Sequence, residues 1–194
     1  MKLLMINACP RSQKVSRSYA LGAAFRDEFM RLQPDTELSE IRLCELNLHP
    51  LTENNIASGN AAPDETGLAL AEQFAAADVI SISAPYWNFL YPAVLSTYIE
   101  NICVSGITFT YVNDRPKGLC RAKALTYFTS AGGFIGDNDC GFGYIRAMGT
   151  QLLGISAFYH AEAEGLDCEG MDVPAIMRKA KEDARGIARK VGKL

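Results

Sequence analysis

The stretch APYWNF at residues 84–89 places an unusual group of side chains directly after a hydrophobic segment. Residues 79–84 have the small and apolar side chains of a buried strand, and a polar turn would normally follow such a strand. Pro85 is followed instead by Tyr86, Trp87, Asn88 and Phe89. Aromatic faces stack on flat rings, and an asparagine amide both donates and accepts hydrogen bonds. The stretch predicts binding of a flat heterocycle with polar edges, although aromatic residues in this position can also only cover the core.

A second segment, NACPRSQKVSRS at residues 7–18, has the features of an anion site. It joins a predicted strand to a predicted helix, and a helix N-terminus with unpaired N–H groups attracts phosphate. Its hydroxyl and cationic side chains could contribute, namely Arg11, Lys14, Ser16, Arg17 and Ser18. A serine at this position is also the ordinary N-cap of a helix. The glycine-rich motifs of dinucleotide and P-loop sites do not occur here, so the segment favours a mononucleotide.

A third segment, SAGG at residues 130–133, follows another predicted strand. Gly132 and Gly133 allow the backbone to approach a ligand closely, because neither has a Cβ atom. Ser130 and Ala131 end the strand in the same stretch. Such a pair of glycines on its own would indicate only a flexible turn. Together the three segments suit a mononucleotide with a flat ring, and the isoalloxazine of a flavin fits that description.

Strands and helices are expected to alternate along the chain in a way that positions these segments. Apolar runs predict strands at residues 2–6, 38–43, 78–84, 123–130 and 156–161. Helical spacing predicts helices at residues 18–32, 67–77, 92–103 and 142–153, and a last helix capped by Asp172 with Pro174 in its first turn. A loop is expected at residues 47–65, and ITFTYV at 107–112 followed by the turn NDRPKG predicts a hairpin-like insertion.

This alternation predicts an α/β fold with a parallel sheet and helices on both faces. Ligands of such sheets bind beyond the carboxyl ends of the strands, where the three segments are expected to meet. The length of 194 residues predicts one domain over residues 1–194. The net charge of −3 argues against a nucleic-acid partner, and the sequence has no apolar run long enough to span a membrane. The short apolar start lacks a signal-peptide cleavage site, so a cytoplasmic location is expected.

The cysteine and histidine contents argue against several other site chemistries. The chain has six cysteines without a C-x-x-C pair, and its two histidines, His49 and His160, lie far apart in sequence. A zinc site is therefore not expected, because such sites need clustered thiolates or imidazoles. The sequence lacks a G-x-S-x-G motif, so nothing supports a serine hydrolase.

The chain resembles the flavodoxin-like FMN-dependent NAD(P)H:quinone oxidoreductases, specifically the NADH azoreductase group. The resemblance covers nearly the whole length and depends on SRS at 16–18, APYWNF at 84–89, GITFTYVNDRPKGL at 106–119 and SAGG at 130–133. It implies a five-stranded flavodoxin-like sheet and a homodimer with active sites at the subunit interface. It also implies that Ser16, Arg17 and Ser18 hold the FMN phosphate, while residues 85–89 and 130–133 surround the isoalloxazine.

The same resemblance implies the reaction. NADH or NADPH would give hydride to the flavin, and a quinone or azo compound would then take it in a ping-pong cycle. No side chain is expected to act as an acid or base, because the flavin N5 carries the chemistry. Phe89, Tyr111 and Phe134 are the expected substrate walls, with Tyr111 reaching the flavin of the partner subunit. Two alternatives stay open: a flavodoxin-type electron carrier, and a thiol redox sensor using Cys120 and Cys140.

Overall fold

Five parallel strands form the central sheet in the order β2-β1-β3-β6-β7, as predicted for a flavodoxin-like fold. The computed structural model describes residues 1–56, 63–137 and 139–194. The strands of this sheet are β1 (Lys2–Asn7), β2 (Glu37–Arg42), β3 (Val79–Pro85), β6 (Ala124–Ser130) and β7 (Ala157–Ala163). Every residue of β3 and β6 is buried, because both strands lie inside the sheet and helices cover its two faces.

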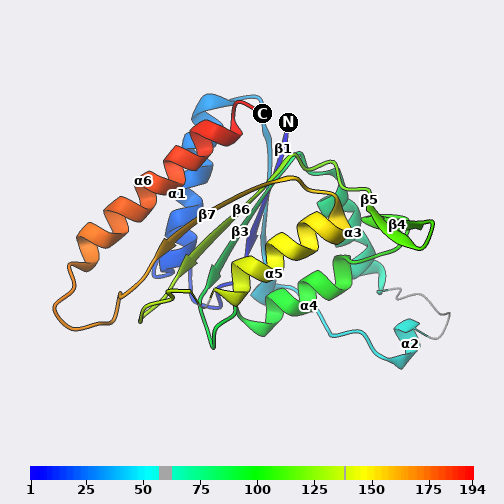
Figure 1. Ribbon diagram of the computed structural model, residues 1–194, viewed down its shortest axis with the longest axis horizontal. Helices are drawn as coiled ribbons and strands as arrows, with labels where there is room; N and C mark the ends of the chain where they lie inside the picture. Colours follow the sequence, from blue (N-terminus) through cyan, green and yellow to red (C-terminus); the bar gives the residue numbers. More distant parts are fainter. Residues whose placement is uncertain (57–62, 138) are drawn as a thin grey trace.

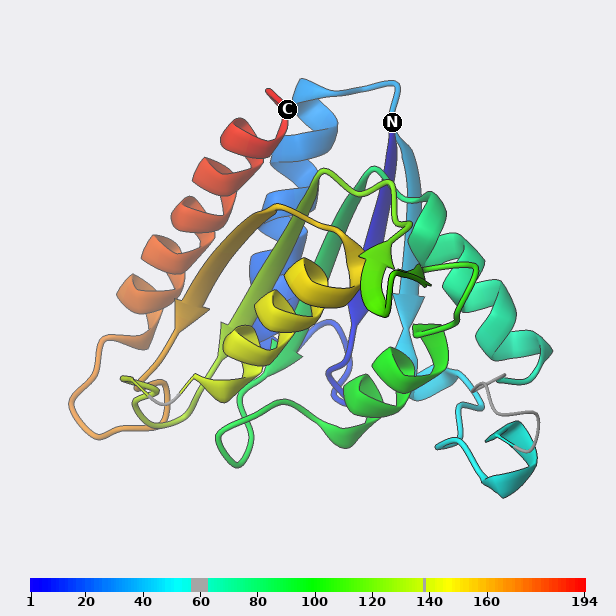
Figure 2. The same ribbon diagram turned by 45° about the vertical axis from the view of Figure 1, so that its right-hand side comes forward.

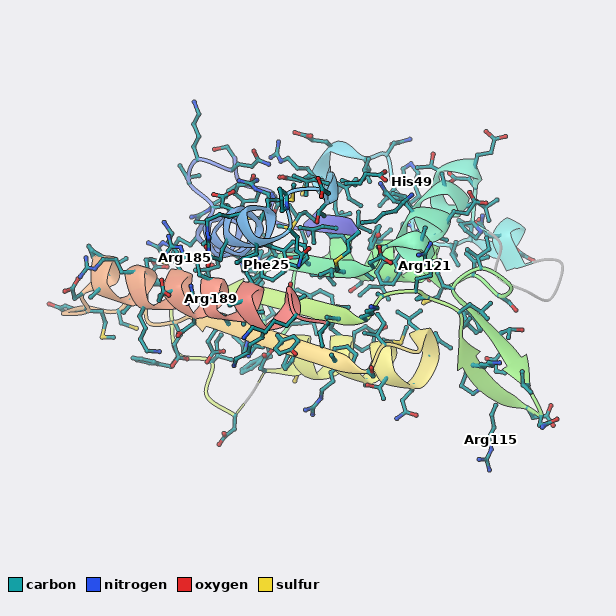
Figure 3. The ribbon with its side chains drawn as sticks, turned by 90° about the horizontal axis from the view of Figure 1, so that it is seen from above. Phe25, His49, Arg115, Arg121, Arg185 and Arg189 are labelled. Atoms are coloured by element: carbon teal, nitrogen blue, oxygen red, sulfur yellow. The ribbon has the colours of Figure 1, made fainter. Side chains whose placement is uncertain are left out.

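The helices lie on both faces of the sheet (Figures 1 and 2). One face carries α1 (Arg17–Leu32) and α6 (Val173–Val191), and the other carries α3 (Glu65–Ala76), α4 (Ala93–Ile102) and α5 (Cys140–Met148). Successive side chains of a strand point to opposite faces. Leu3 and Met5 therefore pack in one core cluster with α1 and α6, whereas Leu4 and Ile6 pack in the other. Phe25 of α1, labelled in Figure 3, belongs to the first of these clusters. Its ring lies 5.4 Å from that of Phe128 of β6, measured between ring centroids.

The predicted insertion is a β-hairpin, but its turn is shorter than the sequence suggested. β4 (Phe109–Val112) pairs antiparallel with β5 (Arg115–Gly118), so only Asn113 and Asp114 form the turn. Both have positive φ angles, 51° and 59°, which is typical of two-residue hairpin turns. The hairpin projects from the body of the protein, with Arg115 extending outward (Figure 3).

Several element boundaries differ from the predictions. The expected loop at 47–65 contains a short helix, α2 (Glu53–Ile56), and its residues 57–62 lie outside the described part. Pro92 is the N-cap of α4 rather than a residue of its first turn. The helix expected at 142–153 begins earlier, since Asp139 caps it, and continues after Met148 as a π-helical turn at Gly149–Leu153. The Asp172 cap and Pro174 in the first turn of α6 are confirmed.

Two further features complete the described chain. A 3₁₀ turn at Leu43–Glu45 follows β2 and ends the strand one residue before the predicted boundary. None of the described helices is both long and apolar enough to cross a membrane.

Candidate functional site

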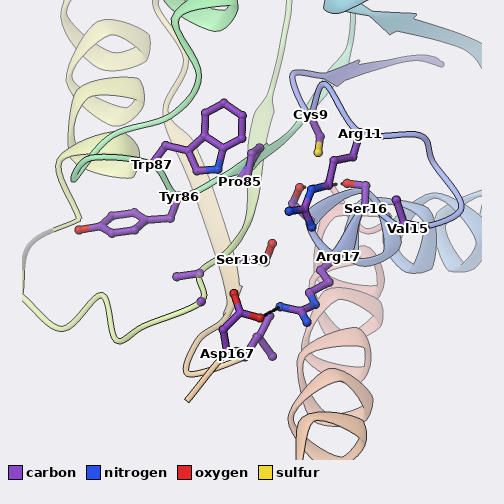
Figure 4. A pocket seen from close by; sticks show the side chains of 14 residues that line it. Cys9, Arg11, Val15, Ser16, Arg17, Pro85, Tyr86, Trp87, Ser130 and Asp167 are labelled. Carbon is purple, nitrogen blue, oxygen red and sulfur yellow. Dashed lines mark hydrogen bonds and ion pairs between the residues drawn. The ribbon is translucent and has the colours of Figure 1, made fainter. Parts of the chain in front are cut away.

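The register of the parallel strands brings the three predicted segments to one edge of the sheet. Pro85 at the end of β3 is opposite Ser130 at the end of β6, and the Tyr86 N–H donates to the Ser130 carbonyl at 2.9 Å. The Ala8 N–H, just after β1, donates to the Ser83 carbonyl at 2.9 Å. A cavity of about 240 Å³ opens between these strand ends (Figure 4).

Most of the predicted site residues line this cavity. Those present are Arg11, Ser16, Arg17, Ser18, Pro85, Tyr86, Trp87, Ser130, Ala131 and Gly132. The residues predicted for the cofactor but absent from the lining are Asn88, Phe89 and Gly133. The lining also includes residues that the sequence did not indicate, namely Cys9, Val15, Leu166 and Asp167.

At one end of the cavity lies the start of α1, where two serine side chains are buried. The Ser16 hydroxyl accepts a hydrogen bond from the Tyr19 N–H at 3.2 Å, so Ser16 is the N-cap of the helix. Its Oγ lies 3.4 Å from Ser18 Oγ. The N–H groups of Arg17 and Ser18 are in the first turn of the helix, where an N–H group has no acceptor within the helix itself. The serine cap and an anion-binding end thus coexist in the same turn.

Cationic and anionic side chains meet at this end of the cavity. Arg17 donates from Nη1 to Asp167 Oδ1 at 2.8 Å, as the dashed line in Figure 4 marks. Arg11 lies in the lining on the side of the α1 N-terminus. The helix N-terminus and these guanidinium groups make the end of the cavity favourable for an anion, while Asp167 offsets part of that charge.

The segment after β3 folds into a tight turn that the sequence did not predict. Trp87 and Leu90 exchange backbone hydrogen bonds of 3.1 and 2.9 Å across Asn88 and Phe89. Asn88 and Phe89 have φ angles of 51° and 65°, the left-handed conformation that a two-residue turn of this kind requires. Asn88 and Phe89, at the tip of this turn, do not line the cavity, whereas Tyr86 and Trp87, which precede the tip, do.

Aromatic side chains around the site are exposed rather than packed into the core. Trp87 is 45% exposed and Phe89 61% exposed, and neither belongs to a core cluster. Tyr111 on the hairpin and Phe134 after β6 are similarly exposed, at 62% and 64%. The simple alternative that the aromatic residues after β3 complete the core is therefore wrong. Partial desolvation, and then the charge of Asp139, raises the pKa of Tyr86.

A fourth segment, residues 164–168 after β7, closes the cavity beside the SAGG segment. The N–H groups of Leu166 and Asp167 donate to the carbonyls of Ala131 and Gly132 at 3.2 and 2.9 Å. A Cβ on Gly132 would lie only 2.4 Å from Asp167 Oδ2, so a larger residue there would displace the Asp167 carboxylate. The rule that ligands bind at the carboxyl edge could have indicated this segment, because β7 ends at the same edge.

The structure does not favour the thiol-sensor alternative. Cys120 is half-buried after the hairpin, whereas Cys140 is exposed at the start of α5, and all six cysteines are free. Burial, and then the neighbouring Cys103 thiol, raises the pKa of Cys120 to about 12. A thiol with such a pKa is almost entirely protonated at neutral pH and is a weak nucleophile.

The fold occurs in several solved enzymes. An FMN-dependent NADH-azoreductase from Bacillus anthracis in complex with FMN has a TM-score of 0.85 at 21% identity, covering 99% of this chain and 100% of that chain. An NAD(P)H:quinone oxidoreductase from Methanothermobacter marburgensis has a TM-score of 0.74 at 19% identity, with 98% and 96% covered. At these identities the likeness concerns the fold.

Sequence comparison is more specific. An FMN-dependent NADH:quinone oxidoreductase from Clostridium acetobutylicum is 35% identical, over 95% of this chain and 98% of that protein. A second, from Lachnoclostridium phytofermentans, is 32% identical over 97% and 98%. The model of the flavodoxin-like fold family matches residues 1–187. The chain therefore belongs to the flavodoxin-like family that includes the FMN-dependent NADH:quinone oxidoreductases.

Proposed function

We propose that this protein is an FMN-dependent NADH:quinone oxidoreductase that also reduces azo compounds. One observation carries the proposal: a single cavity joins the buried hydroxyls and free N–H groups at the start of α1 to an aromatic wall after β3. A mononucleotide with a flat ring needs those two surfaces side by side. The 35% identity to an FMN-dependent NADH:quinone oxidoreductase over nearly the whole chain supports the same function.

The α1 end of the cavity suits the FMN phosphate. The cap uses only a lone pair of Ser16 Oγ, so one hydroxyl hydrogen of the Ser16–Ser18 pair is free, and the other can turn from the 3.4 Å contact between the two hydroxyls to the phosphate. The N–H groups of Arg17 and Ser18, together with the Arg11 and Arg17 guanidinium groups, complete a donor set for a dianion. We therefore assign phosphate binding to Arg11, Ser16, Arg17 and Ser18.

The opposite walls of the cavity suit the isoalloxazine ring. Pro85, Tyr86 and Trp87 supply a largely apolar side, and Ser130, Ala131 and Gly132 supply backbone groups on the other. Asn88, Phe89 and Gly133 lie just beyond these walls, so we assign them to the rim. Cys9, Val15, Leu166 and Asp167 join the cofactor site because they line the same space.

Bound FMN would supply the group that accepts hydride from NADH or NADPH and passes it to the acceptor. The residues of this chain would bind and orient the reactants, because no side chain of the described cavity is needed as an acid or base. The exposed rings of Phe89, Tyr111 and Phe134 are suited to flat acceptors such as quinones and azo compounds. A nicotinamide cosubstrate also fits the cytoplasmic location expected from the sequence.

The exposed hairpin supports a homodimer. Phe109 and Tyr111 make an edge-to-face contact at 5.7 Å, yet Tyr111 remains 62% exposed on an element that projects from the body. A twofold dimer would bury the same apolar surface on both subunits and bring Tyr111 to the partner's site. Light scattering at micromolar concentration should give twice the mass of the chain, and a monomer would reject the arrangement.

Steady-state kinetics of the FMN-loaded protein test the proposed function. NADH oxidation should depend on FMN and on a quinone, and rates measured at several quinone concentrations should give parallel double-reciprocal lines, as in ping-pong kinetics. The electron-carrier alternative predicts no NADH oxidation until a separate reductase is added. Intersecting lines would retain the enzyme but reject the ping-pong order.

A further inference from the structure

We propose that Asp139, His160 and Glu162 form a binding site for a divalent transition-metal ion, with Zn²⁺ as the best-matched ion. The three side chains come from two elements: Asp139 caps α5, and His160 and Glu162 lie on the edge strand β7. One potential ligand atom from each lies within 4.8 Å of the others. The site is separate from the cavity proposed for FMN, which none of these residues lines.

The distances between these atoms suit three ligands of one metal ion better than direct hydrogen bonds between the side chains. His160 Nε2 lies 3.3 Å from Glu162 Oε2 and 3.6 Å from Asp139 Oδ2. Ligand atoms around a tetrahedral zinc ion with bonds of about 2.0–2.1 Å are about 3.4 Å apart. His160 Nε2 and Asp139 Oδ2 are nevertheless buried without a hydrogen-bond partner among the described residues. Buried polar atoms normally have such a partner, and a cation would satisfy both.

Contacts around the cluster hold two of the ligands in place. Asp139 Oδ1 accepts a hydrogen bond from the Phe142 N–H at 2.9 Å, which leaves Oδ2 directed to the cluster. The His160 ring stacks on Phe142, with centroids 4.6 Å apart and an interplanar angle of 15°. Ligands whose orientation is fixed in this way lose little entropy when an ion binds. Glu162 is more exposed, so it can adjust to complete the coordination.

The charge of the cluster also favours a cation. Asp139 and Glu162 each bring a carboxylate to the cluster, beside the imidazole of His160. A donor set of one imidazole and two carboxylates suits Zn²⁺, and three protein ligands leave a position for water. The ion would join the start of α5 to the edge of the sheet.

Zn²⁺ binding to the FMN-loaded protein, measured by competition with a chromophoric chelator, tests this site. Three variants provide the comparison: His160→Gln, Asp139→Asn and His49→Gln. Asparagine retains an oxygen for the helix cap, so Asp139→Asn removes the charge with little effect on α5. His49→Gln is the matched control, because it removes the other histidine of the chain, whose carbonyl accepts a hydrogen bond from Asn101 of α4 and which is not part of the cluster.

We expect wild-type protein and His49→Gln to bind one Zn²⁺ with equal affinity, and His160→Gln and Asp139→Asn to bind it at least tenfold more weakly. Zn²⁺ should also raise the melting temperature of wild type and His49→Gln, but not that of His160→Gln or Asp139→Asn. Equal affinity in wild type and His160→Gln would overturn the proposal, as would Zn²⁺ binding that disappears only when the cysteines are alkylated. In that second case the thiols would be the ligands. Neither result depends on whether FMN supports NADH oxidation.

Discussion

Arg17 and Asp167 lie 150 positions apart in sequence, and their side chains form a 2.8 Å hydrogen-bonded ion pair inside the proposed cofactor cavity. Arg17 is the first residue of α1, and Asp167 belongs to the segment after β7. The pair therefore connects the first helix to the segment that follows the last strand, across the anion-binding end of the cavity. Asp167 places a negative charge close to the predicted phosphate position.

Replacing Asp167 by asparagine should tighten FMN binding. The substitution removes a charge that opposes the phosphate and releases the Arg17 guanidinium for it. We expect FMN affinity to rise about two- to tenfold, or about 0.4–1.4 kcal/mol. The free energy of unfolding of the apo-protein should change by less than about 1 kcal/mol, because exposed ion pairs contribute little. Fluorescence titration of FMN measures the affinity, and a weaker complex would show that Asp167 supports the ligand instead.

The double variant Ser16→Ala, Ser18→Ala should distinguish FMN from riboflavin. Hydrogen bonds to a charged group contribute about 1.5–3 kcal/mol each, so FMN affinity should fall at least about tenfold. Riboflavin lacks the phosphate, and its affinity should stay the same. Ser12→Ala, an exposed serine of the same loop, is the control and should bind FMN normally. An equal loss of affinity for both flavins would show that the phosphate does not bind at the start of α1.

Trp87→Ala should damage FMN binding or turnover more than it damages folding. Trp87 is 45% exposed, whereas Phe128 is fully buried in the core. Truncating Phe128 to alanine should cost about 3–5 kcal/mol of unfolding free energy, and Trp87→Ala should cost clearly less. Apo-protein denaturation and steady-state kinetics on both variants make the comparison. If Trp87→Ala were as unstable as Phe128→Ala and had normal turnover, Trp87 would contribute to the core rather than to the cofactor site.

Phe89→Gly should relieve backbone strain in the turn after β3. Phe89 has a φ angle of 65°, a conformation that costs non-glycine residues about 1–2 kcal/mol. The free energy of unfolding should therefore rise, or stay equal if the exposed ring contributes packing. Turnover of bulky acceptors should fall, because the ring lies at the proposed rim. Unchanged kinetics together with higher stability would show that Phe89 does not contact the acceptor.

Glu28 should stabilise the protein in a pH-dependent way. Hydrogen bonds from Arg31 and Arg189 lower its pKa to about 2, and the Arg189 contact at 3.2 Å joins α1 to α6. A lowered carboxyl pKa contributes stability that is complete above about pH 4.5 and is lost as the pH falls toward 2. Glu28→Gln should therefore be less stable than wild type at pH 7 and equally stable near pH 2. A difference that persists at pH 2 would not come from this charge.

The strand and helix pattern could be predicted because apolar periodicity is local information. The fully buried strands β3 and β6 and the long amphipathic helix α6 follow directly from it. Several element boundaries differ from the prediction, since they depend on caps such as Asp139 and on packing such as that of Gly118 against Gly154.

The sequence predicts the site residues that lie at strand ends, but not those whose position depends on the geometry of a turn. Tyr86, Trp87 and Ser130 lie at strand ends, and the parallel register brings them together. Asn88 and Phe89 adopt left-handed conformations at the tip of a turn and do not line the cavity. A phenylalanine in the sequence does not indicate such a conformation. The end of β7 could have indicated the segment of Asp167, but its ion pair with Arg17 could not be predicted, because it depends on backbone hydrogen bonds of that segment with Ala131 and Gly132.

The central claim is that this cavity binds an FMN that exchanges electrons with NADH and with a quinone. The most direct measurement is the visible absorbance of the FMN-loaded protein, without oxygen, first mixed with NADH and then with a quinone. The flavin band should bleach with NADH alone and return when the quinone is added. In Ser16→Ala, Ser18→Ala at limiting FMN, both changes should shrink in proportion to the lost cofactor. A band that NADH does not bleach in the absence of another protein would contradict the proposed function.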